Sequence, residues 1–200
     1  DISTWDVSNV TSLDEMFQSA ISFNQDLSEW DVSNAITISG MFRFASAFNG
    51  DISTWNVSNV SDMWHLFEGA SSFEGDLSNW DVSSVVNMEA MFQNTPFNGS
   101  VGSWNVSAVS TMKLMFSDAI NLDQDLSNWD VSSVTDFTDM FNNTPELSDE
   151  NKCFIHNSWK SNSYWPYSDW ESICSFISCK PTNLSVSIGQ NENVLSWNEP

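Results

Sequence analysis

The chain carries very little positive charge. Among its 200 residues, five lysines and arginines stand against 27 aspartates and glutamates, and the formal net charge is −22 at pH 7. So negative a chain repels the phosphates of nucleic acids and of anionic lipids, which argues against nucleic-acid binding and against attachment to a membrane surface. Because the sequence also lacks a run of about 18 apolar residues, we expect no segment to insert into a membrane.

The sequence is equally poor in the residues on which most catalysis depends. It has two histidines and three cysteines, and it contains no G-x-S-x-G, H-E-x-x-H or phosphate-binding loop motif. No acid, base and nucleophile converge at one place in the chain. We therefore predict that the protein is not an enzyme and needs no catalytic cofactor.

A repeat of 25 residues fills most of the chain. The decapeptide DISTWDVSNV at residue 1 returns at residue 51 as DISTWNVSNV. A unit of this length cannot enclose a core alone, so the copies must stack and share one. We predict six stacked turns over residues 1–147 and, because residue 1 already opens a repeat, further repeats or a cap upstream. The repeated tryptophans mark the copies, with one interval of 24 residues: Trp5, Trp30, Trp55, Trp80, Trp104 and Trp129.

Each copy predicts one short helix and an extended segment. In the first copy, Leu13, Met16, Phe17 and Ala20 fall at i, i+3, i+4 and i+7, the spacing of one helix face. Residues 2–10 are rich in β-branched and aromatic side chains, which favour short strands that would pair in parallel between copies. The predicted fold class is an α/β repeat solenoid, with one short helix and one or two short parallel strands per 25-residue turn and a helical C-terminal cap.

The recurring aromatic residues are expected in the core. A ladder of tryptophans would also suit stacking on sugars, but a large ring at the same place in every turn is most simply a packing layer. We therefore assign Trp5 and its five equivalents to the core, and we do the same for a column of phenylalanines: Phe17, Phe42, Phe67, Phe92, Phe116 and Phe141.

Two columns of acidic residues invite two interpretations. The first column is the aspartate that opens five of the six copies. Its side-chain oxygen can hydrogen-bond to its own backbone, or several of these carboxylates together can bind calcium. The fifth copy has Ser100 there, which favours the hydrogen bond. The second column alternates Asp6, Asp31, Asp81 and Asp130 with Asn56 and Asn105, so the oxygen matters there more than the charge. The calcium candidates are Asp1, Asp26, Asp51, Asp76 and Asp125.

The period stops after residue 147. Residues 148–180 contain two helix starts and the chain's three cysteines, which predict a helical cap with a disulfide in an exported protein. Cys153 can pair with Cys174 or with Cys179, and the sequence does not choose between them. Residues 181–200 alternate like a β-hairpin and resemble the first strands of a fibronectin type III domain, in which Trp197 would pack in the core.

The repeat itself resembles a known family. The stretch from Trp5 to Asp26 follows the pattern W-D-V-S-N-V-T-x-L-x-x-M-F-x-x-A-x-x-F-N-x-D. This pattern is similar to the BspA-like, leucine-rich-repeat-like repeats of bacterial surface proteins, also described as the Mycoplasma lipoprotein-associated repeat. The resemblance implies a secreted or cell-surface protein with an adhesive or interaction role. The family has no shared catalytic motif, and its partners vary.

Two functions follow from these observations. The first is a non-catalytic adhesion module, part of a larger multidomain protein, that binds an extracellular protein or glycan through residues that differ between turns. Trp64 and Phe44 break the repeat pattern and are the candidates for such a patch, whereas His65 is given no special role. The alternative is a passive spacer, with or without bound calcium. Further variable positions precede the tryptophans: Thr4, Glu29, Thr54, Asn79, Ser103 and Asn128.

Overall fold

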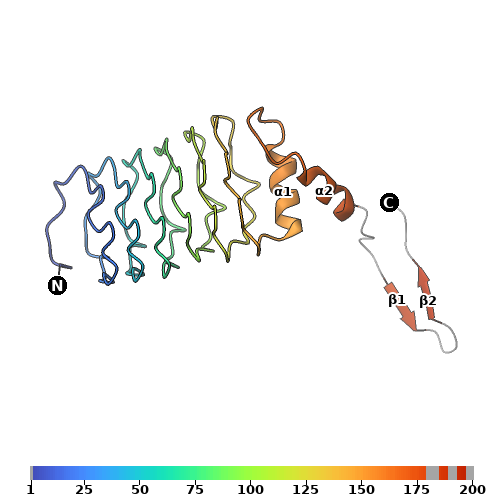
Figure 1. The fold of residues 1–200 in the computed structure, drawn as a ribbon, viewed down its shortest axis with the longest axis horizontal. Helices are drawn as coiled ribbons and strands as arrows, with labels where there is room; N and C mark the ends of the chain where they lie inside the picture. The colour runs from blue at the N-terminus through green and yellow to red at the C-terminus, as the bar shows by residue number, and fades with distance from the viewer. Residues whose placement is uncertain (1, 179–184, 189–192, 197–200) are drawn as a thin grey trace.

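A computed structural model describes residues 2–178, 185–188 and 193–196 (Figure 1). It contains two helices, α1 (Asp149–Trp159) and α2 (Trp170–Ser178), and two strands, β1 (Ser185–Ile188) and β2 (Asn193–Ser196). The strands pair antiparallel, with Ser185 opposite Ser196. Neither helix has the length or the apolar character needed to cross a bilayer.

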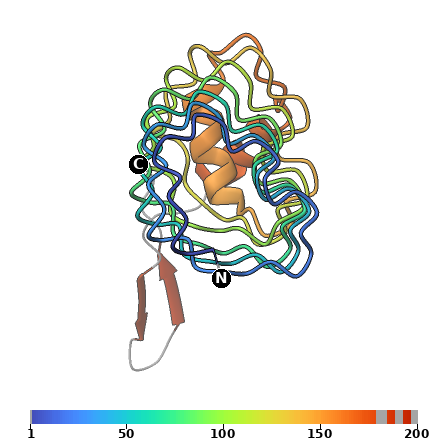
Figure 2. The same ribbon diagram turned by 90° about the vertical axis from the view of Figure 1, so that its left-hand side faces the viewer.

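The repeats form six turns of chain stacked on one another. Figure 1 shows the turns side by side, and Figure 2 shows them superimposed along the axis of the stack. Single parallel β-bridges connect each turn to the next through Ser12, Thr37, Asp62, Asn87, Thr111 and Asp136. Each 25-residue repeat of the sequence therefore forms one turn of the stack.

The predicted α/β solenoid is wrong. In residues 2–148 the structure has no helix and no strand, only turns and isolated bridges. In the segment expected to be helical, Met16 donates its N–H to the carbonyl of Leu13, three residues back. The neighbouring N–H groups of Glu15 and Phe17 instead leave the turn and bond to Ser39 and Met41 of the next copy, at 2.9 Å each.

Left-handed backbone conformations produce this alternation. Glu15 and Ser19 have φ values of 55° and 58°, and the equivalent positions of later turns repeat them, as Phe44 and His65 do. A left-handed residue interrupts an α-helix and redirects the following peptide group. Alternate N–H groups then point along the stack and bond to carbonyls of the next turn, which gives these peptide groups partners outside their own turn.

The aromatic residues pack in continuous columns. Phe42 stacks on Phe67 with ring centroids 5.7 Å apart, and Trp80 packs against the Phe67 ring of the preceding turn. Each buried tryptophan of the repeats also donates its indole N–H to a carbonyl one turn back, as Trp80 does to Ile52 at 3.1 Å. Five of the six repeat tryptophans are at most 4% exposed: Trp30, Trp55, Trp80, Trp104 and Trp129.

The prediction that Trp5 lies in the core is wrong. Its side chain is 53% exposed, whereas Trp30 is buried. The reason lies in the packing: Trp30 rests on Phe17 of the preceding turn, with ring centroids 5.9 Å apart. No described turn offers Trp5 an equivalent phenylalanine.

The two helices close the other end of the stack. Ser148 caps α1 by accepting a hydrogen bond from the N–H of Asn151. The Tyr167 hydroxyl accepts one from the N–H of Phe141 at 2.7 Å, and burial raises the pKa of Tyr167 to about 12. Cys153 and Cys174 form a disulfide between the helices, with Cα atoms 5.0 Å apart, while Cys179 lies outside the described residues.

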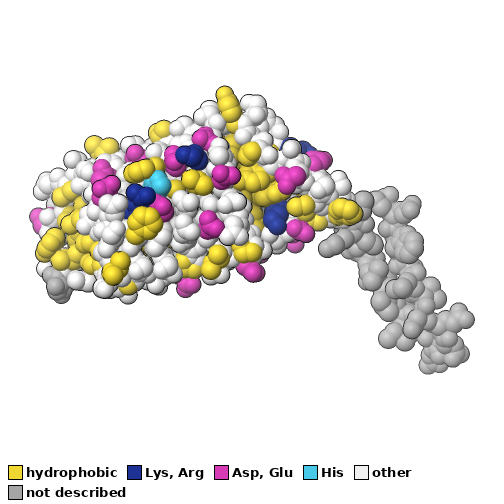
Figure 3. Space-filling model, viewed as in Figure 1, with side chains coloured by type: hydrophobic (Ala, Val, Ile, Leu, Met, Phe, Trp, Pro, Cys, Tyr) yellow, Lys and Arg dark blue, Asp and Glu magenta, His cyan; other side chains and the backbone are white. Residues whose placement is uncertain are grey.

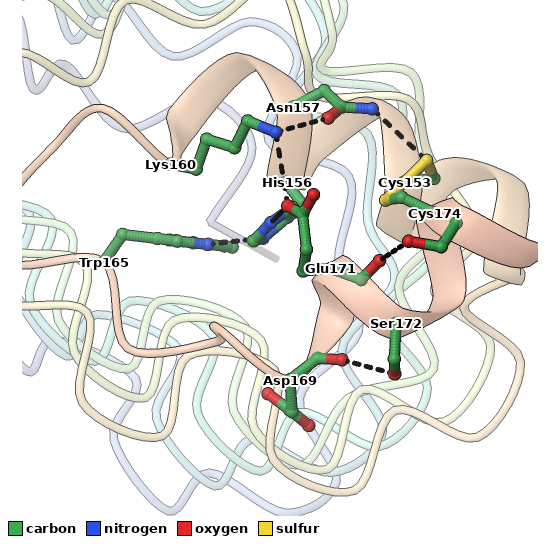
Figure 4. A network of polar contacts seen from close by, with 10 residues as sticks. Cys153, His156, Asn157, Lys160, Trp165, Asp169, Glu171, Ser172 and Cys174 are labelled. Carbon is green, nitrogen blue, oxygen red and sulfur yellow. Dashed lines mark hydrogen bonds and ion pairs between the residues drawn. A yellow bond between two sulfur atoms is a disulfide. The ribbon is translucent and has the colours of Figure 1, made fainter. Parts of the chain in front are cut away.

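A polar network connects α1, the loop after it and α2 near the disulfide (Figure 4). The indole N–H of Trp165 donates to Nδ1 of the buried His156 at 3.1 Å, and His156 Nε2 lies 2.8 Å from Glu171. Because an indole can only donate, His156 must accept at Nδ1 and present its proton at Nε2. Hydrogen bonds from His156 and Lys160 lower the pKa of Glu171, so the carboxylate stays ionised beside them.

Candidate interaction surface

One face of the stack varies from turn to turn within a constant framework. Each tight-turn segment keeps an apolar first residue, a methionine or leucine fourth, a phenylalanine fifth, and an alanine or threonine eighth. The second, third, sixth and seventh positions differ between neighbouring copies and form four columns along the stack. We call these columns the variable face. It consists of those positions in residues 13–20, 38–45, 63–70, 88–95, 112–119 and 137–144.

The second and third turns bring five unlike side chains of the variable face together. Arg43 forms an ion pair with Glu68 of the next turn. Its guanidinium carbon lies 4.9 Å from the ring centre of Phe44 and 5.8 Å from that of Trp64, within the range of cation–π attraction. Nδ1 of His65 contacts the same Glu68 carboxylate, and the His65 ring meets Trp64 edge-on. We call this group the Arg43 cluster.

The charges in the Arg43 cluster compensate one another. Burial raises the pKa of Glu68, but hydrogen bonds and positive charge from His65 and Arg43 outweigh that effect, so its pKa lies below the ordinary value. Glu68 is therefore an anion beneath the guanidinium. The cluster offers a partner two aromatic rings and the donors of a guanidinium that is already held in place.

A glycine lets the Phe44 ring lie flat against the next turn. Gly69 has a φ of +68°, and a Cβ atom there would meet the Phe44 ring at 2.4 Å. Only glycine allows so close an approach with this backbone conformation. Phe44 is nevertheless 40% exposed, so its other side faces outward.

The other basic residue of the repeats also lies on the variable face. Lys113 pairs with Glu89 of the preceding turn at 2.9 Å, and this hydrogen bond raises the pKa of Lys113. Figure 3 shows basic, acidic and apolar side chains gathered on this view of the stack. Both basic side chains of an otherwise acidic array are thus concentrated on one surface.

The predicted acidic columns make local hydrogen bonds. Asp51 accepts the N–H of Ser53 at 2.9 Å, and bonds from Ser53 lower the pKa of Asp51. Asp26, Asp76 and Asp125 likewise accept a hydrogen bond from the N–H of the serine two residues on. The second column repeats this contact with either side chain: the carboxylates of Asp6, Asp31, Asp81 and Asp130, and the amide oxygens of Asn56 and Asn105.

The calcium interpretation gains no support from this geometry. Within the described ranges there is no group of three or more histidine, cysteine, aspartate or glutamate residues arranged to hold a metal ion. Asp1, the first calcium candidate, lies outside those ranges.

Sequence reasoning located part of the Arg43 cluster. The sequence predicts Trp64 and Phe44 in an exposed patch, and both rings lie within 5.8 Å of the Arg43 guanidinium carbon. The sequence pattern does not single out Arg43 or Glu68, and it gives His65 no special role. A signal for the ion pair was present, because Arg43 and Glu68 occupy the same position in successive copies. The residues that precede the tryptophans, from Thr4 to Asn128, are all exposed but include no aromatic residue.

Two overlapping parts of the chain, residues 1–96 and 73–167, match a family model described as Mycoplasma protein of unknown function, DUF285. Together the matches span the repeats and most of the helical cap. Comparison with curated proteins gave no match. Comparison with solved structures gave none either.

Proposed function

The chain belongs to the DUF285 family of repeat-containing Mycoplasma proteins, and from this premise we propose that it is a non-catalytic interaction module that binds through its variable face. The proposed setting is the cell surface or the extracellular space, in line with the resemblance to BspA-like surface repeats. The proposed partner is a protein or glycan on another cell or surface. Residues 181–200 would begin a fibronectin type III-like domain of the same chain.

The observation that carries this proposal is the contrast between constant and changing positions. Packing needs Phe67 and its equivalents in every turn, and the sequence keeps them. Nothing in the packing demands a tryptophan at position 64 or an arginine at position 43, because the equivalent residues in other turns differ. Partly exposed aromatic rings and arginine are the residue types enriched at binding surfaces.

A passive spacer is the competing function. A spacer needs six similar turns and gives no reason for unlike side chains to meet at one place. The Arg43 cluster concentrates two aromatic rings and a cation on two adjacent turns. This concentration favours the binding function.

The proposal is tested with the purified chain on arrays of extracellular proteins and glycans. We expect a saturable partner whose binding is lost in the double variant Phe44→Ala, Trp64→Ala. Ile120→Ala is the matched control, because Ile120 is also apolar and 52% exposed but lies outside the variable face. Absence of any partner, or binding that survives the double variant, would overturn the proposal.

A further inference from the structure

The last repeat turn is covered differently from the others. Inside the stack, the Trp104–Val109 segment is covered by the equivalent segment of the next copy, which begins at Trp129. The last copy has α1 and the loop after it as its neighbour instead. A hollow of about 360 Å³ lies between residues 129–135 of the last copy and residues 158–164 of the cap. This hollow is remote in sequence from the Arg43 cluster.

Hydrogen bonds set the walls of the hollow. The side-chain amide of Asn162 donates to the carbonyls of Val131 and Val134, at 2.8 and 2.9 Å. Its oxygen accepts the N–H of Tyr164 at 2.8 Å. Asn162 therefore fastens the loop to the last turn, and the hollow exists before any ligand arrives.

A ladder of backbone hydrogen bonds between turns ends at Thr135, a residue that lines this hollow. In successive turns the N–H of Ser110 donates to Val86, and that of Thr135 donates to Ser110, at 2.8 and 2.9 Å. Each carbonyl of this ladder faces the next turn. Thr135 is the last member, and no backbone donor among the described residues reaches its carbonyl. Thr135 is also one of the residues that line the hollow.

Further polar groups surround that carbonyl. Asp130 uses one oxygen to accept the N–H of Ser132 at 3.0 Å, and the hydrogen bonds from Ser132 lower the pKa of Asp130, which keeps it an anion. Ser161 and Ser163 add hydroxyl groups that can donate or accept. Tyr164, 58% exposed, places an aromatic ring at the edge.

Trp159 forms part of the wall and is chemically unusual in this chain. Its Nε1 is the buried side-chain nitrogen or oxygen that has no hydrogen-bond partner within the described residues. The equivalent group of Trp129 donates to Val101 at 3.0 Å. The Trp159 indole N–H is therefore a sensitive reporter of any acceptor or ordered water that enters beside it.

We propose that this hollow binds a neutral saccharide of one or two sugar units. A sugar has hydroxyls that donate to the Thr135 carbonyl and the Asp130 carboxylate and accept from the serine hydroxyls, and an apolar C–H face that packs on the Tyr164 ring. Few convergent polar groups beside an aromatic surface are what a small-molecule site requires. This site is separate from the variable face and does not depend on the function proposed for that face.

The test is a titration of the whole chain with maltose, cellobiose and lactose at millimolar concentrations. The indole N–H signals are followed by NMR, and Trp159→Phe identifies the signal of Trp159. At least one disaccharide should shift the Trp159 signal saturably. Tyr164→Ala should weaken this binding about tenfold or more, because it removes the stacking ring. The double variant Phe44→Ala, Trp64→Ala should leave it unchanged.

The variant Asp130→Asn removes the charge proposed to bind the sugar and keeps the side-chain oxygen that accepts the N–H of Ser132. Asn56 and Asn105 make the same serine contact in other turns, so the variant should fold normally and bind the sugar more weakly. Asp81→Asn, at the equivalent place in the fourth copy, is the matched control and should bind as the wild type does. Ethanolamine, a small alcohol with a positively charged amine, is the control for simple attraction to the Asp130 carboxylate. No shift with any of the three sugars, or a shift with ethanolamine alone, would overturn the saccharide proposal.

Discussion

Trp159 of α1 stacks on Trp129 of the last repeat, with ring centroids 6.1 Å apart and 15° between the ring planes. Trp159 also packs on Phe141 at 6.3 Å, the distance that separates Trp129 from Phe116 one turn earlier. A helix thus supplies the ring that a further repeat would supply. The cap stabilises the stack by continuing its aromatic column.

Truncation of Trp159 should therefore release the cap. We expect Trp159→Ala to lower the free energy of unfolding by about 3–5 kcal/mol, the usual cost of removing a buried aromatic side chain. Trp159→Phe should cost less, because it keeps a ring in the column. Chemical denaturation followed by circular dichroism measures both. Trp5→Ala is the control at the exposed end of the same column and should have a small effect.

Reduction of the disulfide should loosen the same region. Cys153 and Cys174 are 21 residues apart, and a bridge that closes a loop of this size contributes roughly 3 kcal/mol by restricting the unfolded chain. We expect the double variant Cys153→Ser, Cys174→Ser to unfold at a lower denaturant concentration. Cys179→Ser should not change the midpoint, since Cys153 and Cys174 bond to each other. An equal loss in the Cys179 variant would contradict this pairing.

The acidic columns should make stability depend on pH in one direction. Hydrogen bonds from Ser83 hold the pKa of Asp81 below its ordinary value of 3.8. A group with a lowered pKa in the folded state contributes stability that is present above its unfolded pKa. That contribution is lost as the pH falls through the lower, folded pKa. The melting temperature of the repeat array should therefore stay constant from pH 7 to pH 5 and fall below about pH 3.8.

Substitution of Asp81 separates its oxygen from its charge. At pH 7, Asp81→Asn should stay within a few tenths of a kcal/mol of the wild type, because an amide oxygen can accept the same bond and the site is exposed. Asp81→Ala loses the bond and should be less stable than Asp81→Asn. Below pH 3.8 the asparagine variant should lose less stability than the wild type. Equal destabilisation by both substitutions at pH 7 would sink this account.

Much of the architecture follows from the sequence alone, but the local backbone does not. The spacing of Leu13, Met16, Phe17 and Ala20 correctly marks side chains that belong together, although it wrongly predicts a helix. A series of turns, each closed by a hydrogen bond to the carbonyl three residues back, returns side chains to one face at similar intervals. The difference lies in left-handed residues such as Glu15, which carry no sequence signature, and in bonds to a turn far along the chain.

The candidate surface was predictable only where a residue broke the repeat. Trp64 and Phe44 stand out because other copies have small or polar residues at their positions. The role of His65 depends on its contact with Glu68, three residues away, and on Arg43, one turn back. Those contacts can be predicted only when the register between turns is known. The repeat period alone does not show that equivalent positions of successive turns lie side by side.

The close approach of Phe44 to Gly69 gives the sharpest test of that register. Gly69 and Gly40 both have left-handed backbones, at φ values of +68° and +59°. A methyl group at Gly40 would meet the flexible Glu15 side chain at 3.3 Å and the Arg43 side chain at an ordinary contact distance of 3.9 Å, whereas one at Gly69 would meet the Phe44 ring at 2.4 Å. Gly40→Ala should therefore cost about 1–2 kcal/mol, the cost of a left-handed alanine.

Gly69→Ala should cost a further 1–3 kcal/mol or so, because the Phe44 ring must move. Adding Phe44→Ala to Gly69→Ala should recover that excess and bring the double variant to the level of Gly40→Ala. Denaturant unfolding of the wild type, Gly69→Ala, Phe44→Ala and the double variant measures the coupling, and Gly40→Ala gives the cost of the backbone conformation alone. If Gly69→Ala and Gly40→Ala are equally destabilised, the ring does not rest on the next turn, and the arrangement of the Arg43 cluster would need to be redrawn.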